Sequence, residues 1–279
     1  MAASEALAID RLGTADVDAG LRLSDAAGWN QTADDWAFFV AQGDAFCIRD
    51  SDAALISTAV ALPYGAGVGW ISMVLVDVRH RHRGHATRLL AACVDALQSA
   101  GRVAVLDATP DGAAIYRRAR FVSGFGFERW QGDAAGANPS PGESVVDERR
   151  GGLLALDRAT SGLDRSTLLA NVLARPSTRA WLASDASGFA VLRAGRRAQQ
   201  LGPIVAANEK AAVALLGRTL DAATGPVFID VPSRWPTLAA ALGERGFVRQ
   251  RSFVRMALGE TAALAASARV FAVAGPEFG

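Results

Sequence analysis

The sequence is poor in several residue types, and each scarcity narrows what the protein can be. It has two cysteines and three histidines, and Lys210 is its only lysine. Two cysteines are too few for a disulfide framework, which favours a reducing compartment and predicts a cytoplasmic protein. The P-loop signature is excluded, because it needs a glycine-rich loop that ends in Gly-Lys-Ser/Thr and the single lysine follows no such loop.

Long apolar runs and an excess of one charge are also lacking. No apolar run approaches the roughly 20 residues of a membrane span. The first twelve residues carry charges where a signal peptide needs an apolar core. The formal net charge of +1 is too small to favour nucleic acid as a partner. We therefore expect a soluble protein that binds neither membranes nor nucleic acid.

The composition that is present predicts packed globular domains. The chain has 279 residues, enough for two domains of ordinary size, and 51% of them are hydrophobic. Gly, Pro, Ser and Asn gather between Gly132 and Glu143, which is typical of a linker. We predict a first domain over residues 1–131, a linker over 132–143 and a second domain over 144–279.

Hydrophobic periodicity predicts a similar order of elements in both halves. In the first half we expect strands at 7–12, 45–49, 53–62, 68–78, 103–108 and 123–130, with helices at 15–27, 32–41, 84–100 and 111–119. In the second half we expect strands at 189–194, 199–206, 227–231 and 247–258, with helices at 208–222 and 236–245. Leu106-Asp107 matches Ile229-Asp230, and Arg120-Phe121 matches Gly246-Phe247. The offset of about 125 residues indicates a duplicated domain rather than a short-period repeat.

The most informative segment is Ile71–Ala86, a buried-type strand that runs through a tight loop into an amphipathic helix. Backbone N–H groups at a helix start lack intrahelical partners and attract anions. Gly84 would let the backbone approach an anion closely. With one glycine, the loop does not match the Gly-x-Gly-x-x-Gly dinucleotide signature. The segment predicts binding of a pyrophosphate.

The spacing Arg81-x-x-Gly84-x-Ala86 resembles the acyl-CoA pyrophosphate loop of the GNAT (GCN5-related) N-acetyltransferases. The resemblance implies an α/β fold with a mixed (α+β) sheet. The implied fold consists of two tandem GNAT-like domains, each with a mostly antiparallel sheet, a splayed parallel strand pair and flanking helices. Acetyl-CoA would lie in the splay between strands 74–78 and 103–108, and backbone donors near Val76 would hold the oxyanion. The implied cofactor contacts are Leu75, Val76, Val78, Arg81, His82, Arg83, Gly84, His85, Ala86, Thr109 and Tyr116.

By the same resemblance, Tyr116 lies where the family places the acid that protonates the departing thiolate. A phenol is protonated at neutral pH and can donate a proton. The segment departs from the family pattern: Thr109 stands for a frequent Asn, Arg120 for a Gly, and Val78 for a Pro. The alternative role of Tyr116 is structural, with its ring packed in the core and its hydroxyl in water.

Trp29 and Asn30, in the Gly28–Thr32 stretch, lie where family members build the acceptor pocket, so we expect them to bind substrate. The alternative is a Trp that covers the core edge beside a helix cap at Asn30 or Thr32. Asp107 could hold a water chain for the general base, or it could cap the next helix. The histidines lie in a loop that would point them apart, so we expect no metal site.

The Gly-Trp-Asn-Gln-Thr, Leu-Asp-Ala-Thr-Pro and C-terminal Ala-Gly-Pro-Glu stretches resemble those of bacterial two-domain GNAT proteins over the whole length. The second half has no glycine at its helix entry, and Glu209 stands near the place of the pyrophosphate, which predicts a degenerate copy. We expect transfer of acetyl from acetyl-CoA to a primary amine of a small molecule in a ternary complex, by a monomer or homodimer. The alternatives are an acyl-CoA-binding or sensing module and an acyltransferase that acts on a protein lysine.

Overall fold

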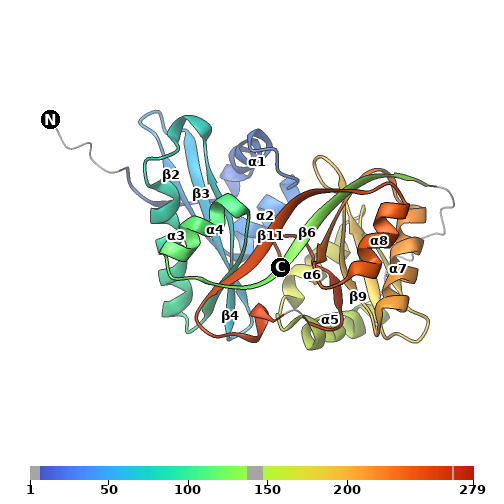
Figure 1. The fold of residues 1–279 in the computed structure, drawn as a ribbon. Helices are drawn as coiled ribbons and strands as arrows, with labels where there is room; N and C mark the ends of the chain where they lie inside the picture. The colour runs from blue at the N-terminus through green and yellow to red at the C-terminus, as the bar shows by residue number, and fades with distance from the viewer. Residues whose placement is uncertain (1–6, 137–146, 266) are drawn as a thin grey trace. The chain divides into compact units, whose positions relative to one another are not determined.

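The structure is a computed structural model that describes residues 7–136, 147–265 and 267–279 (Figure 1). The chain divides into two compact units, unit 1 over Met1–Ala104 and unit 2 over Val105–Gly279. The predicted linker begins well after this division, and the predicted domain bounds stay a prediction. Among the described residues, no helix has both the length and the apolarity that crossing a membrane requires.

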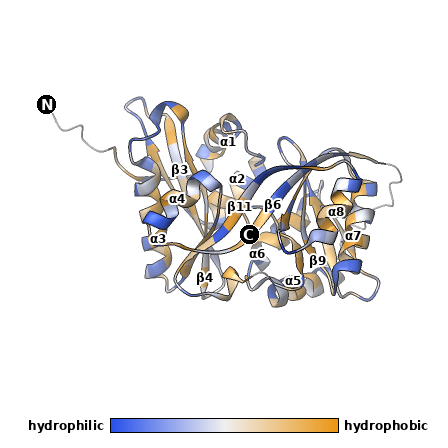
Figure 2. Ribbon diagram, in the orientation of Figure 1, coloured by the Kyte–Doolittle hydropathy of each residue, from blue (hydrophilic) through white to orange (hydrophobic). Residues whose placement is uncertain are grey.

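Unit 1 is built on an antiparallel sheet with helices packed on it. Its strands are hydrogen-bonded in the order of the chain: β1 (Asp10–Arg11), β2 (Asp44–Arg49), β3 (Leu55–Tyr64) and β4 (Val68–Val76). Its helices are η1 (Thr14–Asp16), α1 (Val17–Ala26), α2 (Ala33–Gln42), η2 (Val78–His80) and α3 (His85–Ser99). Figure 2 shows hydrophilic and hydrophobic stretches along α3, as expected for a helix that covers a sheet with one face.

Small residues let the helices of unit 1 approach their neighbours closely. A Cβ at Gly20 in α1 would lie 2.5 Å from the ring of Trp36 in α2. A Cβ at Gly69 in β4 would overlap the side chain of Leu97 in α3. The indole of Trp36 is fully buried and donates to Ser24 Oγ at 3.0 Å. The Trp36 contacts hold α2 against α1, and the close approach of Leu97 to Gly69 holds α3 against β4, the strand that precedes it.

Unit 2 contains a longer mixed sheet in the order β5-β11-β6-β10-β9-β8-β7, with β12 beside β9. Its strands are β5 (Val103–Ala108), which begins in the last residues of unit 1, β6 (Val122–Ala135), β7 (Arg179–Leu182), β8 (Phe189–Arg193), β9 (Gln199–Val205), β10 (Thr224–Pro232), β11 (Val248–Leu258) and β12 (Val270–Ala272). Its helices are α4 (Pro110–Arg118), α5 (Asp147–Ser161), α6 (Ser166–Ala174), α7 (Glu209–Ala222), α8 (Pro236–Glu244) and η3 (Ala262–Leu264).

The last strands of the two sequence halves are exchanged in unit 2. β6 ends the first half, yet it pairs with β10 and β11 of the second half, antiparallel to both. β11 ends the second half and stands between β5 and β6. Figure 1 shows β6 and β11 running together as two long strands. Residues 105–135 are therefore built into the same sheet as the second half.

Most predicted elements are present, with small shifts at their ends. Helices are confirmed close to the predicted bounds at α2, α3, α4, α7 and α8. The first predicted strand shrinks to Asp10–Arg11, while β6 continues through Ala135, so residues 132–135 of the predicted linker are strand. Residues 137–143 of that linker lie outside the described residues. The sequence analysis missed α5, α6, β7 and β12.

Candidate acetyl-CoA site

The strand that precedes the predicted pyrophosphate loop is irregular. The pairing of β4 with β3 shifts register between Thr58 and Val60, and Met73 in β4 has a positive φ of 53° while its side chain is buried. Thr58 Oγ1 donates to Met73 O at 2.8 Å, and Ser57 Oγ donates to Leu75 O at 2.7 Å. A bulge of this kind is frequent next to functional sites, where it redirects backbone groups.

The predicted contacts Leu75 and Val76 lie in the part of β4 that follows the bulge. The Leu75 side chain is buried, whereas Val76 is half-buried. The Leu75 carbonyl is engaged by Ser57, so β3 side chains take up part of the polar backbone of β4 on this side. The hypothesis that backbone groups near Val76 hold the oxyanion stays a prediction.

Asp77 organises the loop between β4 and α3. Its side chain caps η2 by accepting from Arg79 N at 2.9 Å and also accepts from Arg79 Nε at 3.1 Å. These bonds from Arg79, with a further contact to His80, lower the pKa of Asp77 to about 2. Val78, which stands for the family's proline, is 70% exposed. The loop is therefore held by an ionised carboxylate and not by a proline.

Gly84 gives α3 an open N-terminus. It is the N-cap, with a left-handed φ of 79°, and has no side chain to cap the helix. A Cβ placed on it would meet no atom within 4 Å. No side chain thus caps the first turn of α3, where backbone N–H groups and the positive end of the helix dipole favour phosphate groups.

The side chains around Gly84 separate into an exposed and a buried group. Arg81, His82 and Arg83 are exposed, and His82 has a positive φ of 62°. Arg81 Nε donates to Val76 O at 3.4 Å, and Arg83 Nη2 donates to Arg79 O at 3.3 Å. These long bonds leave other guanidinium N–H groups available as phosphate donors.

His85, the first residue of α3, is buried with only 7% of its surface exposed. Neither ring nitrogen has a hydrogen-bond partner in the structure. Burial, together with the positive charges of Arg88 and Arg83 and the nearby His80, lowers the pKa of His85. The ring is therefore neutral at neutral pH. Across the described residues, no three His, Cys, Asp or Glu side chains form a group suited to a metal ion.

Tyr116 lies on α4, in unit 2, and its position is fixed by a well-capped helix. Thr109 caps α4 by accepting from Gly112 N at 3.3 Å, and Pro110 stands in the first turn. Tyr116 is half-buried, with its ring centroid 6.0 Å from that of Phe121. A Cβ at Gly112 would lie 3.1 Å from the Tyr116 ring, so the glycine makes room for the ring along the helix.

Asp107 is fully buried at the end of β5 and binds Arg255 of β11. Arg255 donates through Nε to Oδ1 and through Nη2 to Oδ2 of Asp107, each at 2.9 Å. Burial raises the pKa of Asp107, and the Arg255 guanidinium opposes that shift. The structure thus gives both carboxylate oxygens a partner within unit 2, and a role in substrate binding stays a prediction. Sequence reasoning missed Arg255, since it lies in the other half of the chain.

The same pair recurs with the halves reversed. Asp230 at the end of β10 accepts from Arg129 Nε at 2.9 Å and from Arg129 Nη2 at 2.7 Å. Gln200 Nε2 adds a third bond to Asp230 at 3.0 Å. Burial lowers the pKa of Arg129, but the Asp230 carboxylate outweighs burial and the net pKa is raised. Each half therefore supplies an aspartate to one pair and an arginine to the other.

The predicted acceptor stretch joins α1 to α2 in unit 1. Thr32 caps α2 and forms a capping box with Asp35, which confirms the cap as one of the two roles considered. Trp29 is half-buried, and Asn30 is buried with 4% of its surface exposed. Gln31, which the sequence analysis did not single out, is also buried, and its Oε1 has no partner. A buried amide oxygen without a donor is a candidate contact for a substrate N–H.

In the second half, the helix that corresponds to α3 starts differently. Asn208 caps α7 by accepting from Ala211 N at 3.0 Å, and Glu209 accepts from Thr237 N at 3.2 Å. A side chain therefore occupies the first turn, and a carboxylate stands beside it. Both features disfavour a phosphate group.

The strand pair of the second half that corresponds to the cofactor splay is filled by the end of the chain. β9 and β10 pair in parallel at Gln199–Leu201, and beyond that β12 pairs with Ile204 and Val205 of β9. Val273 N, directly after β12, donates to Asp230 O of β10 at 3.0 Å. Phe271 and Phe278 of this terminal segment are buried. The splay is thus closed by protein, which favours the predicted degeneracy of the second half.

The predicted site residues fall into two groups. Residues 75–86, with Trp29 and Asn30, lie in unit 1, whereas Asp107, Thr109 and Tyr116 lie in unit 2. At the start of β5, Val103 N donates to Gly67 O directly before β4, at 2.9 Å. The two strands that the resemblance places on either side of acetyl-CoA therefore begin next to each other.

Comparisons with known proteins agree with this architecture. Residues 20–121 match the acetyltransferase (GNAT) family, and residues 153–272 match an acetyltransferase (GNAT) domain. The uncharacterized N-acetyltransferase YitH of Bacillus subtilis (strain 168) is 26% identical over 238 residues, which cover 81% of this chain and 83% of YitH.

Solved structures show the same tandem fold. A presumed acetyltransferase from Pyrococcus horikoshii superposes with a TM-score of 0.81 at 16% identity, covering 100% of this chain and 98% of its own. A tandem GNAT protein from the clavulanic acid biosynthesis pathway superposes with a TM-score of 0.62 at 15% identity, covering 92% of this chain and 100% of its own. Because the two GNAT matches together span most of the sequence, this chain belongs to the GNAT superfamily of N-acetyltransferases and carries two GNAT domains in tandem.

Proposed function

We propose that the first half binds acetyl-CoA and transfers its acetyl group to a primary amine of a small molecule in a ternary complex. The observation that carries this proposal is the open N-terminus of α3 at Gly84, which offers backbone N–H groups to a pyrophosphate. Membership of the GNAT superfamily supplies acetyl-CoA as the matching ligand. The exposed Arg81 and Arg83 side chains add donors for the phosphate oxygens.

In this proposal the chain's own residues perform three tasks. The α3 N-terminus orients the cofactor, so that the thioester and the amine meet in one complex. Backbone donors of β4 near the bulge at Met73 stabilise the negative charge on the carbonyl oxygen. Tyr116 gives its proton to the thiolate as the carbon–sulfur bond breaks, and the amine loses a proton to solvent.

The α1–α2 stretch is our candidate for acceptor binding. Its buried side chains carry amide groups, and Gln31 Oε1 has no partner. An amide oxygen accepts from the N–H groups of an uncharged or protonated amine. A small acceptor is favoured over a protein lysine because Asn30 and Gln31 are buried, at 4% and 5% exposure. We propose that the protein acts in the cytoplasm as a monomer or homodimer, without membrane or nucleic-acid partners.

The activity is tested by following release of free CoA from acetyl-CoA across a panel of small primary amines. For an amine that is turned over, we expect Tyr116→Phe to lower kcat by about 100-fold, the lower range for loss of a general acid, with little change in KM for acetyl-CoA. Tyr64→Phe is the matched control, since Tyr64 is the chain's other tyrosine and is buried in unit 1. Turnover by Tyr116→Phe at the wild-type rate would contradict the assigned role.

A further inference from the structure

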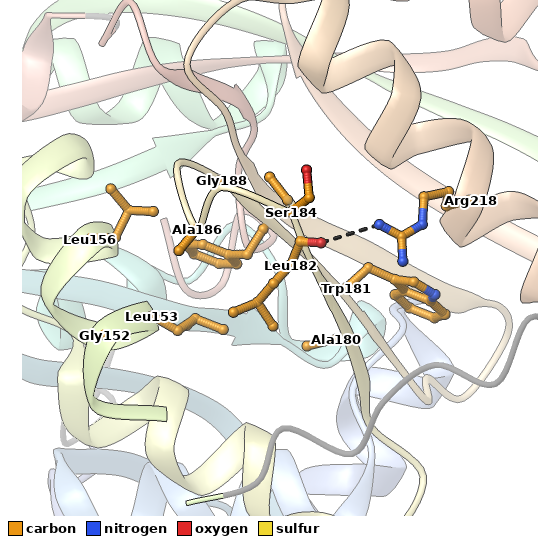
Figure 3. A pocket seen from close by; sticks show the side chains of 12 residues that line it. Gly152, Leu153, Leu156, Ala180, Trp181, Leu182, Ser184, Ala186, Gly188 and Arg218 are labelled. Carbon is orange, nitrogen blue, oxygen red and sulfur yellow. Dashed lines mark hydrogen bonds between the residues drawn. The ribbon is translucent and has the colours of Figure 1, made fainter. Parts of the chain in front are cut away.

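A pocket in the second half of the chain shares no residue with the predicted acetyl-CoA site. It lies beside β7, between α5 and α7, and has a volume of about 540 Å³ (Figure 3). This volume falls in the range of pockets that hold small molecules, about 300–1,000 Å³. Its walls come from α5, from β7 and the turn that leads to β8, and from α7.

The internal duplication explains why a pocket forms there. β7 occupies the place in the second half that β2 occupies in the first, because each is the first of three consecutive strands that follow two helices. In unit 1, β1 pairs with the outer edge of β2. Within the described part of unit 2, β7 ends the sheet and has no such neighbour. The pocket stands at the edge where the first half has an additional strand.

The lining is apolar on the α5 side and has the Arg218 guanidinium on the α7 side. Leu153 and Leu156 of α5 face the pocket, as Figure 3 shows. Trp181 of β7 also lines the pocket, but its side chain belongs to the core of the second half and only 2% of its surface is exposed, so its indole Nε1 is out of reach of a bound molecule.

Arg218 adds a positive charge at the same pocket. Arg218 Nη1 donates to Leu182 O at 3.1 Å, which holds the guanidinium of α7 at the pocket wall (Figure 3). Its other N–H groups remain as donors for an anion. None of the residues that line the pocket is acidic. An apolar cavity with a guanidinium at its wall matches a molecule that has an apolar body and a carboxylate.

We infer that the second half of the chain binds a small amphipathic carboxylate in this pocket. The apolar body would lie against Leu153 and Leu156, and the carboxylate would accept from Arg218. The second half would then be a ligand-binding domain in its own right, although its cofactor splay is closed by β12. This inference does not depend on the acyl-transfer activity proposed for the first half.

The test is a calorimetric titration of the full-length protein with decanoate at pH 7.5, with decylamine as the probe of opposite charge. We expect saturable binding of one decanoate per chain and no saturable binding of decylamine. Arg218→Gln removes the charge, and we expect it to weaken decanoate binding about tenfold.

Two adjacent glycines on α5 provide a matched pair of variants. Gly152 lines the pocket and Gly151 does not, and a Cβ on either would meet no atom within 4 Å. Leucine is a better helix former than glycine, so both substitutions should fold. We expect Gly152→Leu to block decanoate binding and Gly151→Leu to leave it unchanged.

Several outcomes would overturn the inference. These are absence of saturable decanoate binding, equal binding of decylamine, and equal effects of Gly152→Leu and Gly151→Leu. Displacement of decanoate by acetyl-CoA would also overturn it, because that result would place the carboxylate in the cofactor site. Failure of the amine-turnover assay would leave the inference intact, since the titration requires no activity.

Discussion

Arg120 has a left-handed backbone conformation that normally favours glycine. It ends α4 with a φ of 69°, and Phe121 N donates to Tyr116 O at 3.0 Å to close the helix. The second half uses the same closure at Gly246, with a φ of 79° and a bond from Phe247 N to Leu242 O. Glycine adopts this conformation without the steric cost that a Cβ brings. The unusual arginine noticed in the sequence therefore occupies a strained position.

We expect Arg120→Gly to raise the free energy of unfolding by about 1 kcal/mol, because it removes the left-handed strain. Gly246→Ala is the reverse change and should lower it by a similar amount, since a Cβ there has open space and suffers only the unfavourable φ. Urea unfolding of both variants measures the two differences. A loss of stability in Arg120→Gly would show that the arginine side chain contributes more than its backbone costs.

Asp77 makes part of the stability of unit 1 depend on pH. Its folded pKa of about 2, lowered by its bonds from Arg79, lies below the value of about 3.9 expected when unfolded. A carboxyl with a lowered folded pKa contributes stability above its unfolded pKa and loses it as pH falls towards the folded pKa. Asn can still cap η2, so Asp77→Asn loses only the charge that the exposed Arg79 binds, and we expect it to cost about 0.5–1 kcal/mol at pH 5–8, with the difference from wild type vanishing between about pH 4 and pH 2.

The measurement is urea unfolding of wild type and Asp77→Asn at a series of pH values. Asp185→Asn serves as a comparison in unit 2, because hydrogen bonds from Ser187 also lower the pKa of Asp185 and should give a pH dependence of the same sign. A difference between wild type and Asp77→Asn that stays constant down to pH 2 would exclude titration of Asp77 as its cause.

At the scale of elements, the exchanged strands β6 and β11 bind the two sequence halves together. Each brings an arginine to a buried aspartate of the other half, Arg129 to Asp230 and Arg255 to Asp107. Removing one partner of a buried ion pair leaves a charge without compensation and costs about 3–5 kcal/mol. Removing both charges at once avoids that cost.

We therefore expect Arg255→Leu to lower the free energy of unfolding by about 3–5 kcal/mol, and Asp107→Asn combined with Arg255→Leu to recover most of it. Arg251→Leu is the control on the same strand. Within the described residues, Arg251 forms no ion pair with an acidic side chain. The three variants are compared by urea unfolding. Additive losses in the double variant would contradict a direct Asp107–Arg255 interaction.

The sequence predicted the helices and strands better than it predicted which strands pair and which side chains meet. α3 and α4 were predicted because their apolar spacing, caps and terminal glycine or proline are local signals. The exchange of β6 and β11 has no local signal, because a strand has the same pattern wherever it stands in the sheet. The partners of Asp107 and Asp230 lie 148 and 101 residues away in the chain. For the same reason, closure of the second splay by β12 could not be predicted from residues 270–272.

The candidate site shows the same division. The loop at Arg81–Ala86 was recognised from its spacing, and the structure adds why Gly84 matters: a left-handed N-cap with open space above it. The buried state of Gln31, the neutral His85 and the fixed position of Asp107 depend on packing with distant residues. These features could therefore be identified only from the folded structure.

At the scale of the whole molecule, the two halves differ at the start of one helix: α3, which follows β4 in the first half, and α7, which follows β9 in the second. The first half leaves the N-terminus of α3 open at Gly84, while the second half caps α7 with Asn208 and closes its splay with β12. A duplicated fold with one open and one closed site predicts one cofactor per chain. The second half is then free for another ligand or for supporting the shared sheet.

The measurement that tests this account most directly is a calorimetric titration of the full-length protein with acetyl-CoA. The account predicts one site per chain, lost in Gly84→Asp and kept in Gly101→Asp, because Gly101 has a similar φ of 70° and open space at the other end of α3. Asp tolerates the left-handed conformation, so both variants should fold. Two sites per chain, no binding, or binding retained by Gly84→Asp would contradict it.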